Sequence, residues 1–472
     1  MPAQKKTKPT IKGATKSAGA KKTPAPKAAA KPAVKADTGA NQKGYETLRG
    51  MKDILPKDEK YWLAAYATAS NIAQAYSYGY IETPIVENAK LFIRSIGKGT
   101  DVIEKEMYVF DDRDATKVCL RPEATASVVR AYIGHGMQSV PQPVKVWYQG
   151  PMFRHDRPQA GRYRQFHQFG CEVIGEKDPV VDAELITVAY NFLLDLGVES
   201  LVHINSIGNL EERQQYIIEL VGYLRSKRAY LCEDCKIRIN KNPLRVLDCK
   251  ETGCQEVLEE APQIIEWLST ESKDFFMKVL EYLDELHIPY MIQPKLVRGL
   301  DYYTDTVFEL YAEQEESGAQ SALGGGGRYD MLVEQLGGRA GTPGSGFSIG
   351  LERVVNVLKH KESAVTEDKK KMVRKGFFFA QLGGQARRSA LRLIEELRRS
   401  HMRVGSNLCK NSLKTQLELA DKMHASHTII LGQKEVQEGT VIVRDMDSGI
   451  QEIIDQKKLE KHLRKLLGEG SL

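Results

Sequence analysis

Four arginines stand at positions where folding could gather them around a negatively charged ligand. Arg154 and Arg162 lie in one basic segment, MFRHDRPQAGRYRQ, while Arg298 opens RGLDYY and Arg353 lies in GLERV. A guanidinium group stays protonated in proteins, and its planar fork fits the oxygens of a phosphate or a carboxylate. Any one of them alone is most simply a solvated or ion-paired surface residue. Several together, beside glycine and aromatic residues, favour an anion-binding site.

The glycine run Gly324–Gly327, within ALGGGGRYD, matches neither common phosphate-binding loop. It lacks the GxGxxG spacing of a dinucleotide fingerprint, and the chain has no match to the GxxxxGK[ST] pattern of a P-loop. A polyglycine run is usually a flexible turn, and its other use is to let a ligand approach the backbone closely. The sequence alone leaves both interpretations open.

Four of the seven cysteines are clustered in the sequence. Cys232 and Cys235 form CEDC, and Cys249 and Cys254 form CKETGC, which gives the spacing C-x2-C-x13-C-x4-C. The first pair fits a zinc knuckle and the second pair is slightly long. Four thiolates would suit a structural Zn²⁺, and the alternative is four ordinary reduced thiols. The three remaining cysteines are interpreted as small buried apolar residues: Cys119, Cys171 and Cys409.

The basic segment lies between two expected strands. Residues 144–149 and 166–174 have strand patterns, and the segment between them contains Pro158 and Gly161. The simplest arrangement is a long antiparallel hairpin with a basic loop.

Other elements must position the remaining candidates. Helical spacing of apolar residues predicts helices over 61–80 and 180–197, the first ending at Gly79. Residues 303–312 predict a strand, and residues 346–358 predict a strand that passes into a helix.

Two further regions differ in character. Residues 210–290 are charged, helical in pattern and contain the cysteine cluster, which predicts an inserted helical module. After the Lys-rich segment 361–373, strand and helix patterns alternate, which indicates a small α/β domain. Its expected elements are strands at 376–382, 402–405 and 427–432, helices at 385–400 and 412–424, and a hairpin around 440–454.

Composition excludes several classes of protein. The chain has 472 residues, of which 42% are apolar, and about 150 residues per domain suggests three domains. No stretch of ~18 apolar residues predicts a membrane span, and no secretory signal is recognisable. An odd number of cysteines in such a chain argues against a disulfide framework.

Residues 1–43 form a distinct basic segment. They contain 11 Lys, 11 Ala and 5 Pro, with Asp37 as the only acid. Their net charge is therefore +10, whereas the net charge of the whole chain is +6. Such a segment cannot bury enough apolar surface to offset the entropy cost of ordering. We expect a disordered tail that tethers nucleic acid electrostatically, and the alternative is a passive or solubilising extension.

Taken together, the motifs resemble those of the class II aminoacyl-tRNA synthetases, and among them the histidyl-tRNA synthetase family. Three segments are similar to the motifs that define the class: YIETPIVENAKLF (80–92), the basic hairpin (150–173) and GFSIGLERV (346–354). Two segments are particular to the histidine family: LVRGLDYYTDTVFE (296–309) and ALGGGGRYDML (322–332). LRPEATA (120–126) is similar to another family segment.

The resemblance implies an α+β fold, with a class II antiparallel-sheet catalytic core, a helical insertion at about 210–290, and a C-terminal α/β anticodon-binding domain. The implied boundaries are a disordered tail (1–43), a catalytic domain (44–360), a linker (361–373) and the anticodon-binding domain (374–472). It also implies a homodimer, because the first motif forms the dimer interface in this class.

The implied activity has two steps. L-histidine reacts with ATP to give histidyl-adenylate and pyrophosphate, and histidine is then transferred to the 3′ end of tRNA(His). The histidine carboxylate is already ionised at neutral pH, so activation needs no general base. It needs two anions brought together and charge stabilised at phosphorus, with Mg²⁺ bridging ATP phosphate oxygens.

The resemblance carries residue roles onto matching positions. Arg298 and Arg154 are the implied catalytic residues. Glu172 and Tyr303 are implied to contact the imidazole of histidine. The full implied histidine-binding set is Glu123, Ala124, Thr125, Arg154, Gln168, Glu172, Arg298, Tyr302, Tyr303 and Tyr329. The implied ATP-binding set is Arg154, Arg162, Phe166 and Arg353.

Three other functions are weighed against a histidine–tRNA ligase. They are a catalytically inactive, synthetase-like regulatory subunit of histidine biosynthesis, a class II synthetase for another amino acid, and a purely RNA-binding protein. Arg298, the two histidine-specific segments and the C-terminal domain are all present, which favours the ligase. We expect it to act in the cytoplasm, without a membrane partner.

Overall fold

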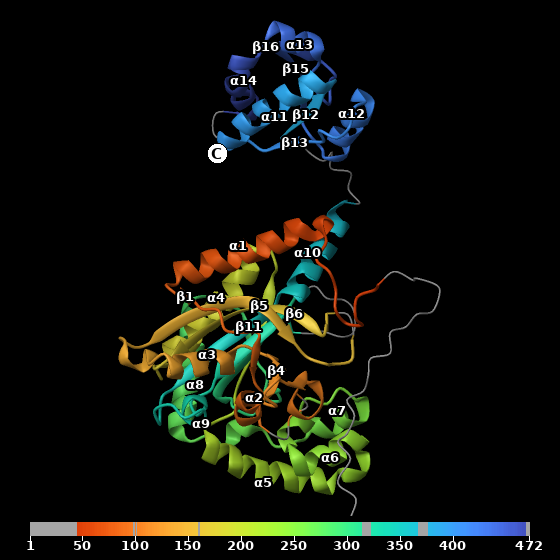
Figure 1. The fold of residues 1–472 in the computed structure, drawn as a ribbon. Helices are drawn as coiled ribbons and strands as arrows, with labels where there is room; N and C mark the ends of the chain where they lie inside the picture. Colours follow the sequence, from red (N-terminus) through yellow and green to blue (C-terminus); the bar gives the residue numbers. More distant parts are fainter. Residues whose placement is uncertain are drawn as a thin grey trace, which may run out of the picture. The chain divides into compact units, whose positions relative to one another are not determined.

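The computed structural model contains an eight-stranded sheet that carries most of the predicted site (Figure 1). The structure describes residues 45–97, 100, 102–158, 161–313, 322–366 and 376–468, so the basic segment 1–43 lies outside the described residues. The strand order is β1-β5-β6-β11-β10-β9-β7-β8. In that order the strands are Gly79–Tyr80, Val144–Phe153, Gln165–Ile174, Gly344–Gly350, Gly324–Arg328, Thr304–Ala312, Ser200–Ser206 and Tyr290–Ile292.

The inner pairs of this sheet are antiparallel, and only β1 and β8 run parallel to their neighbours. The predicted basic hairpin is confirmed as β5 and β6, which pair from Val144 with Ile174 to Phe153 with Gln165. Both strands are longer than their apolar patterns indicated. The α+β class with an antiparallel core is therefore confirmed.

Helices cover one face of the sheet. They are α1 (Glu59–Ala75), α4 (Pro179–Asp195), α8 (Thr270–Glu285) and α10 (Leu351–Thr366). Their apolar side chains share a core with Trp147, Phe169 and Phe347 of the sheet. On β6, Phe169 and Cys171 belong to that core, whereas Gln168 and Glu172 point to the opposite face because successive side chains alternate. The opposite face is thus free to carry a site.

The predicted end of the first helix is wrong by four residues. The helix ends at Ala75, and Ser77 then adopts a left-handed φ of 63°. The Ser77 and Tyr78 amides donate to the Gln74 and Ala73 carbonyls, both at 2.9 Å, which is a Schellman cap. Serine occupies the position where glycine is usual, so the sequence pattern pointed to Gly79 instead, which begins β1.

The glycine run is a strand, β10, and the interpretation as a flexible turn is wrong. It pairs with β9 on one side and β11 on the other. At Gly326 an added Cβ would lie 2.7 Å from Phe347 Cα, and nearer still to the Gly346 carbonyl oxygen. The neighbouring backbones approach so closely that glycine is required here despite its low strand propensity.

The cysteine-containing region is helical, as predicted. Three helices, α5 (Leu210–Ser226), α6 (Glu233–Lys241) and α7 (Thr252–Glu259), pack around Leu220, Ile239 and Leu258. The later part of residues 210–290 instead belongs with the eight-stranded sheet. Helix α8 packs in the core between that sheet and its covering helices, and it leads to β8, which pairs with β7.

Smaller elements frame the site face. Strands β2 (Val86–Asn88), β3 (Val109–Asp111) and β4 (Lys117–Leu120) form a three-stranded sheet. Helices α2 (Ala89–Ile96), α3 (Thr125–Gly134) and α9 (Leu332–Gln335) contribute to the same core as α5.

The C-terminal region has its own five-stranded sheet, in the order β13-β12-β14-β15-β16. These strands are Val404–Ser406, Phe377–Gln381, His427–Leu431, Thr440–Asp445 and Gln451–Asp455. All the predicted strands and helices of this region are present, with α11 at Gly384–Arg399 and α12 at Leu413–Lys422. Two short helices, α13 (Gln433–Glu438) and α14 (Leu459–Leu467), were not predicted.

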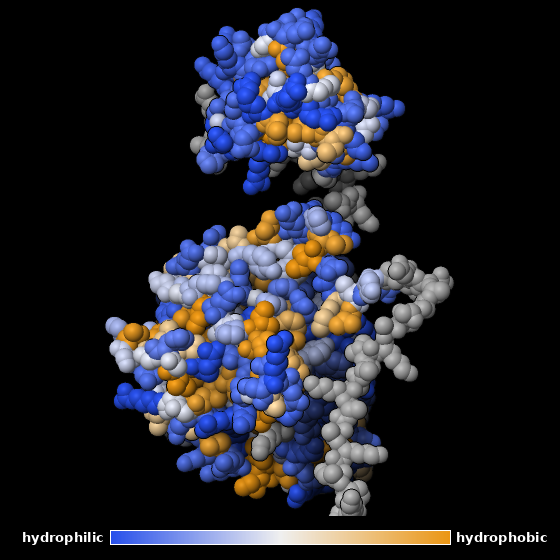
Figure 2. Space-filling model, viewed as in Figure 1, coloured by the Kyte–Doolittle hydropathy of each residue, from blue (hydrophilic) through white to orange (hydrophobic). Residues whose placement is uncertain are grey.

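The proposed domain boundaries stay predictions. In the sequence, residues 367–375 separate the strands of the two sheets, and these residues are outside the described part of the chain. Helix α10 extends through 361–366 of the predicted linker. Figure 2 shows hydrophilic residues over most of the visible surface, with separate apolar patches. Among the described helices, none is long and apolar enough to cross a bilayer.

The β10 packing generates a testable prediction. Gly326→Ala should destabilise the protein by at least about 2 kcal/mol, because its Cβ would overlap backbone atoms that cannot rotate away. Gly222→Ala is the matched control: Gly222 lies in α5 with no atom within 4 Å of an added Cβ, so alanine should be neutral or stabilising. Thermal unfolding midpoints of both variants measure the difference. Equal midpoints would contradict the close-packed strand.

Candidate active site

A cavity of about 1860 Å³ lies on the face of the eight-stranded sheet opposite its helical cover. It gathers residues that are far apart in the sequence. The predicted residues that line it are Glu123, Thr125, Arg154, Arg162, Phe166, Gln168, Arg298, Tyr302, Tyr303, Tyr329 and Arg353. Of the other two, Ala124 is buried at the start of α3, and Glu172 lies beneath the cavity wall.

Glu172 is a buried carboxyl group surrounded by hydroxyls. Tyr329 Oη donates to Oε2 at 2.7 Å, and Thr125 Oγ1 donates to Oε1 at 2.7 Å. Tyr148 Oη makes a longer contact of 3.4 Å with Oε1. Burial raises the pKa of Glu172 to about 8, although the hydrogen bonds from Tyr329 and Thr125 oppose that shift. The group can therefore hold or release a proton near neutral pH.

Sequence reasoning missed Tyr148. It lies on β5 opposite Gly170, two residues from the pairing of Val146 with Glu172. An added Cβ at Gly170 would lie 2.6 Å from the Phe347 carbonyl oxygen, and closer to the Tyr148 ring. The period-2 alternation of β5 and β6 was the available signal, because it puts Tyr148 and Glu172 on one face.

Glu123 is fixed at the start of α3. Its carboxylate accepts the backbone N–H groups of Thr125 at 2.6 Å and Ala126 at 3.0 Å. Burial raises the pKa of Glu123, while those amides and the nearby Arg154 favour its charged form. The helix N-terminus thus holds an oriented carboxylate at the cavity wall.

Gln168 presents an unsatisfied acceptor. Its Nε2 donates to Ser348 Oγ at 3.2 Å, which fixes the side chain between β6 and β11. Its buried Oε1 has no hydrogen-bond partner among the described residues. A ligand with an N–H group would supply one.

Three tyrosines form an aromatic wall beside Arg298. The ring centroids of Tyr302 and Tyr303 lie 4.8 Å apart, and those of Tyr302 and Tyr329 lie 5.8 Å apart. The Arg298 guanidinium lies 5.7 Å from the Tyr303 centroid and pairs with Glu309. Glu309, which the sequence analysis missed, also accepts the Tyr311 hydroxyl at 2.7 Å.

Arg154 lies at the end of the β5–β6 hairpin where Phe153 pairs with Gln165, away from Glu172, and Arg353 lies in α10. Arg154 donates from Nε to the Pro122 carbonyl at 2.8 Å, and its guanidinium lies 5.6 Å from the Phe166 ring centroid. Arg353 donates to the Gly161 carbonyl at 3.1 Å. Burial lowers the pKa of Arg353, and the neighbouring Arg162, Arg154 and Arg298 lower it further. The positive charges of the other three arginines therefore disfavour the charged form of Arg353, and an anion among them would relieve that repulsion.

Arg162 is at the rim. Its side chain is 53% exposed and lies 3.4 Å from Asp156. Of the four arginines it is the one least held in place by the described protein atoms.

A buried ion pair supports the end of β10 next to Tyr329. The Arg328 guanidinium lies 2.9 Å from Asp182 of α4, and both side chains are almost completely buried. Arg328 also lies 3.2 Å from Asp330. The Asp182 contact joins the end of the strand to the helical layer. The pair between Arg328 and Asp330 connects the two residues that flank Tyr329 in the sequence.

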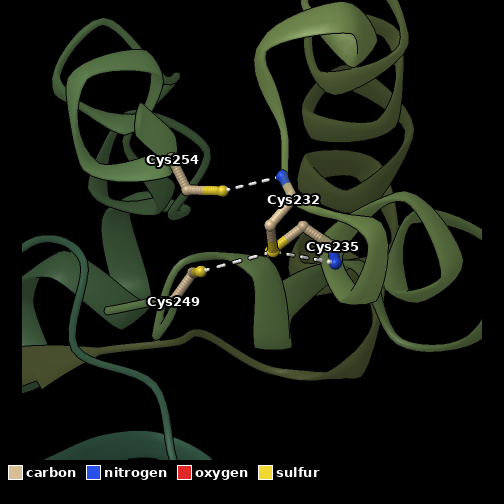
Figure 3. A group of neighbouring side chains, drawn as sticks. All are labelled: Cys232, Cys235, Cys249 and Cys254. Carbon is tan, nitrogen blue, oxygen red and sulfur yellow. Dashed lines mark hydrogen bonds between the residues drawn. The ribbon is translucent and has the colours of Figure 1, made fainter. Parts of the chain in front are cut away.

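The four clustered cysteines converge (Figure 3). Their sulfur atoms all lie within 4.8 Å of one another, and the Cys232 and Cys249 sulfurs are 3.9 Å apart. The Cys232 amide points at Cys254 Sγ at 3.2 Å. Cys119 and Cys171 are buried as predicted, but the prediction for Cys409 is wrong because this cysteine is exposed.

Two family models match the chain. The model described as histidyl-tRNA synthetase matches residues 50–354, and the model described as anticodon binding domain matches residues 377–466.

Relatives and solved structures agree with these matches. The histidine–tRNA ligase of Natranaerobius thermophilus is 42% identical over 422 residues, covering 89% of this chain and 99% of that protein. The apo histidyl-tRNA synthetase of S. aureus has a TM-score of 0.72 at 35% identity, covering 89% of this chain and 99% of the other. A Bacillus halodurans protein, titled ATP phosphoribosyltransferase regulatory subunit/histidyl-tRNA synthetase, covers 84% of this chain and 100% of its own at 19% identity. Its TM-score of 0.60 shows a shared fold alone.

The environment of Glu172 predicts a pH-dependent stability. Its usual pKa of 4.5 is raised to about 8 in the folded chain, so between these values the folded state binds one more proton than the unfolded state. Stability should therefore fall as pH rises, by about 2 kcal/mol between about pH 6 and pH 8. Glu172→Gln should remove this loss, because its amide does not ionise.

Urea unfolding followed by tryptophan fluorescence can measure this effect, since Trp62, Trp147 and Trp267 are the only tryptophans. Glu281→Gln, on the exposed surface of α8, is the matched control and should keep the wild-type pH dependence. The assignment fails if Glu172→Gln loses stability with pH as steeply as the wild type.

Proposed function

The chain belongs to the histidyl-tRNA synthetase family, and we propose that the cavity carries out histidine activation and transfer through the residues that line it. The chain is an ATP-dependent histidine–tRNA ligase. It forms histidyl-adenylate and pyrophosphate from L-histidine and ATP, and transfers histidine to the 3′ end of tRNA(His). The observation that carries the residue assignment is the cavity itself. Its wall brings Glu123 and the hydroxyl groups that surround Glu172 together with the four arginines.

The imidazole of histidine binds between Glu172 and the hydroxyl of Tyr303. An imidazole needs a partner at each ring nitrogen, and a carboxyl group whose pKa is near 8 can accept or share the ring proton. A site that hydrogen-bonds its substrate rejects analogues lacking that group by ~10⁴-fold or more. Tyr302 and Tyr329 close the sides of this pocket.

The α-amino group of histidine binds to Glu123, Thr125 and Gln168, beside Ala124 at the start of α3. The fixed carboxylate of Glu123 supplies a negative charge, and Gln168 Oε1 supplies an acceptor without another partner among the described residues. Both groups select a free ammonium.

Arginines bring the two reacting anions together. One carboxylate oxygen of histidine attacks the α-phosphorus of ATP, and the bond from that phosphorus to pyrophosphate breaks. Arg298 lies between the histidine carboxylate and the α-phosphate, and Arg154 holds the α-phosphate from the other side. Fixed positive charge of this kind stabilises the transition state without reorganisation.

The remaining ATP contacts lie around Arg353. Arg353 and Arg162 bind the other phosphates, and the Phe166 ring stacks on adenine. Mg²⁺ enters with ATP on its phosphate oxygens and keeps several waters, as this ion prefers.

The tRNA binds at both regions of the chain. Loop 155–162 contacts the acceptor end, and residues 374–472 bind the anticodon arm. Helix α11 contributes Arg387, Arg388 and Arg398, whereas Arg392 and Arg399 are paired with acids of the same helix. Among the described residues, no acid is paired with these three arginines, and basic charge of this kind is suited to phosphate contact.

A homodimer forms through the first motif. Tyr80, Ile85 and Val86 are exposed there, as are Val109 and Phe110 of the neighbouring strand β3. Such an apolar patch is typical of a surface that another chain covers. We place the enzyme in the cytoplasm, where charged tRNA is used.

The cysteine cluster binds one structural Zn²⁺. A tetrahedral site with Zn–S bonds of about 2.3 Å requires sulfur atoms about 3.8 Å apart. The 3.9 Å between Cys232 and Cys249, and the 4.8 Å limit for the whole group, fit that geometry with little movement. Four thiolates leave no position for a substrate, so the ion would be structural.

The function is tested by histidine-dependent ATP–pyrophosphate exchange. Arg298→Ala should reduce exchange by about 100-fold or more, because it removes charge at the reacting phosphate. Arg113→Ala, in the exposed turn between β3 and β4, should leave exchange unchanged. The wild type should respond to histidine alone in a panel of amino acids. Folded protein that binds tRNA but shows no exchange with any amino acid would instead indicate the regulatory alternative.

Zinc binding is tested by metal analysis of the purified chain. We expect one Zn²⁺ per chain, and its loss in Cys249→Ser. Cys409→Ser is the matched control, because Cys409 is exposed and lies outside the cluster. A content far below one per chain would exclude the site.

A further inference from the structure

The loop that carries the substrate-binding tyrosines is held by the cysteine-containing helices. We call residues 298–303, RGLDYY, the recognition loop, and residues 236–248, between Cys235 and Cys249, the strap. Asn242 Nδ2 of the strap donates to Asp301 Oδ1 of the loop at 2.9 Å. Arg213, from α5 of the same module, donates to the carbonyl oxygen of Tyr303.

A third contact lies at the start of the loop. An added Cβ at Gly299 would be 3.2 Å from Arg245 Nη1, so this strap arginine lies directly against the loop backbone. Arg245 is in turn 3.6 Å from Asp248, next to Cys249. The recognition loop therefore touches the module along most of its length.

The strap is bounded by cysteines at both ends. Cys235 lies in the first turn of α6, and Asn242 caps the end of that helix through its amide to the Arg238 carbonyl at 2.8 Å. The chain then turns through η5 (Pro243–Val246), and the Cys249 amide donates to Val246 at 3.0 Å. Joining the cysteines therefore fixes where Asn242 stands.

The opposite side of the loop has a backbone anchor. The Asp301 amide donates to the Ile96 carbonyl at the end of α2, at 3.2 Å. The loop thus lies between α2 and the strap. The wall of the active-site cavity includes Cys232 and Cys249 as well as Arg298, Tyr302 and Tyr303, so cluster and loop border the same space.

We infer that the metal-closed cysteine module is a clamp on the recognition loop, with Asn242 as the positioning residue, so that zinc occupancy sets the affinity for histidine. The inference rests on the proposed function and on the proposed zinc site. It gives an ion held by four cysteine side chains an effect on the binding of histidine. Because Asn242 holds Asp301, its effect reaches Arg298, Tyr302 and Tyr303 through the backbone on either side.

The test is the Michaelis constant for histidine in ATP–pyrophosphate exchange. Asn242→Ala should raise it roughly fivefold, the equivalent of about 1 kcal/mol for one hydrogen bond, and should leave the constant for ATP within about twofold. Asn240→Ala is the matched control, because Asn240 lies on the same helix, is exposed, and contacts Arg225 instead of the loop. Its constants should equal those of the wild type.

An exchange of the two partners isolates the contact. Asn242→Asp alone puts two carboxylates together and should raise the constant for histidine more than Asn242→Ala does. Combining it with Asp301→Asn restores a carboxylate–amide pair with donor and acceptor reversed, and should return the constant toward the wild-type value. A variant that merely unfolds the module would not be rescued in this way.

Metal removal tests the link to zinc. Wild-type enzyme stripped by a chelator should show the raised constant for histidine, and added Zn²⁺ should reverse it. If Asn242→Ala behaves like Asn240→Ala, or if stripped enzyme keeps its constant for histidine, the clamp is refuted. Absence of histidine-dependent exchange in untreated wild type would instead refute the proposed function, so the two failures are distinguishable.

Discussion

A carboxyl group buried without a cation beside it constrains how the elements of the cavity meet. Glu172 of β6 needs donors because burial without hydrogen bonds would be costly. Those donors come from α3, from β5 and from the residue after β10, which are remote in the sequence. The tertiary arrangement of strand, helix and loop is therefore coupled to the satisfaction of one side chain. The Arg328–Asp182 pair then fixes one of these donors to the helical layer.

Charge is separated within the same cavity. In the proposed function, Glu172 and Glu123 face the positive and proton-donating groups of histidine, while the arginines of the cavity face the phosphates of ATP. Acids are also present among the arginines, since Glu309 pairs with Arg298 and Asp156 lies 3.4 Å from Arg162. The Arg298–Glu309 pair keeps a partly buried guanidinium compensated while no anion is present, and orients it along the cavity wall.

The sequence predicted those parts of the fold that local patterns determine. The β5–β6 hairpin and the alternating strands and helices of the C-terminal region follow from apolar periodicity. The candidate site residues were identified because they lie in motifs of continuous sequence. The glycine strand was not predictable, since its conformation is imposed by the backbones of β9 and β11 and not by its own propensity. The end of α1 was mispredicted for a related reason, because the left-handed conformation of Ser77 depends on the direction that the following chain takes. Tyr148 and Glu309 were missed because each lies in an ordinary strand pattern and acquires a role only through a residue that the fold brings beside it, Glu172 on the adjacent strand for Tyr148 and Arg298 in a loop for Glu309.

The four consecutive glycines of β10 have a consequence for how this enzyme can change over generations. Gly324 and Gly325 form part of the cavity wall and present only peptide groups there, which neither titrate nor vary with the amino acid encoded. Point mutation at β10 offers selection almost nothing but loss, because almost any replacement puts atoms where neighbouring backbones already lie. Adaptation of the pocket to another substrate would have to proceed through its tyrosines, its carboxylates and its loops, with this strand as an inherited and nearly unchangeable surface.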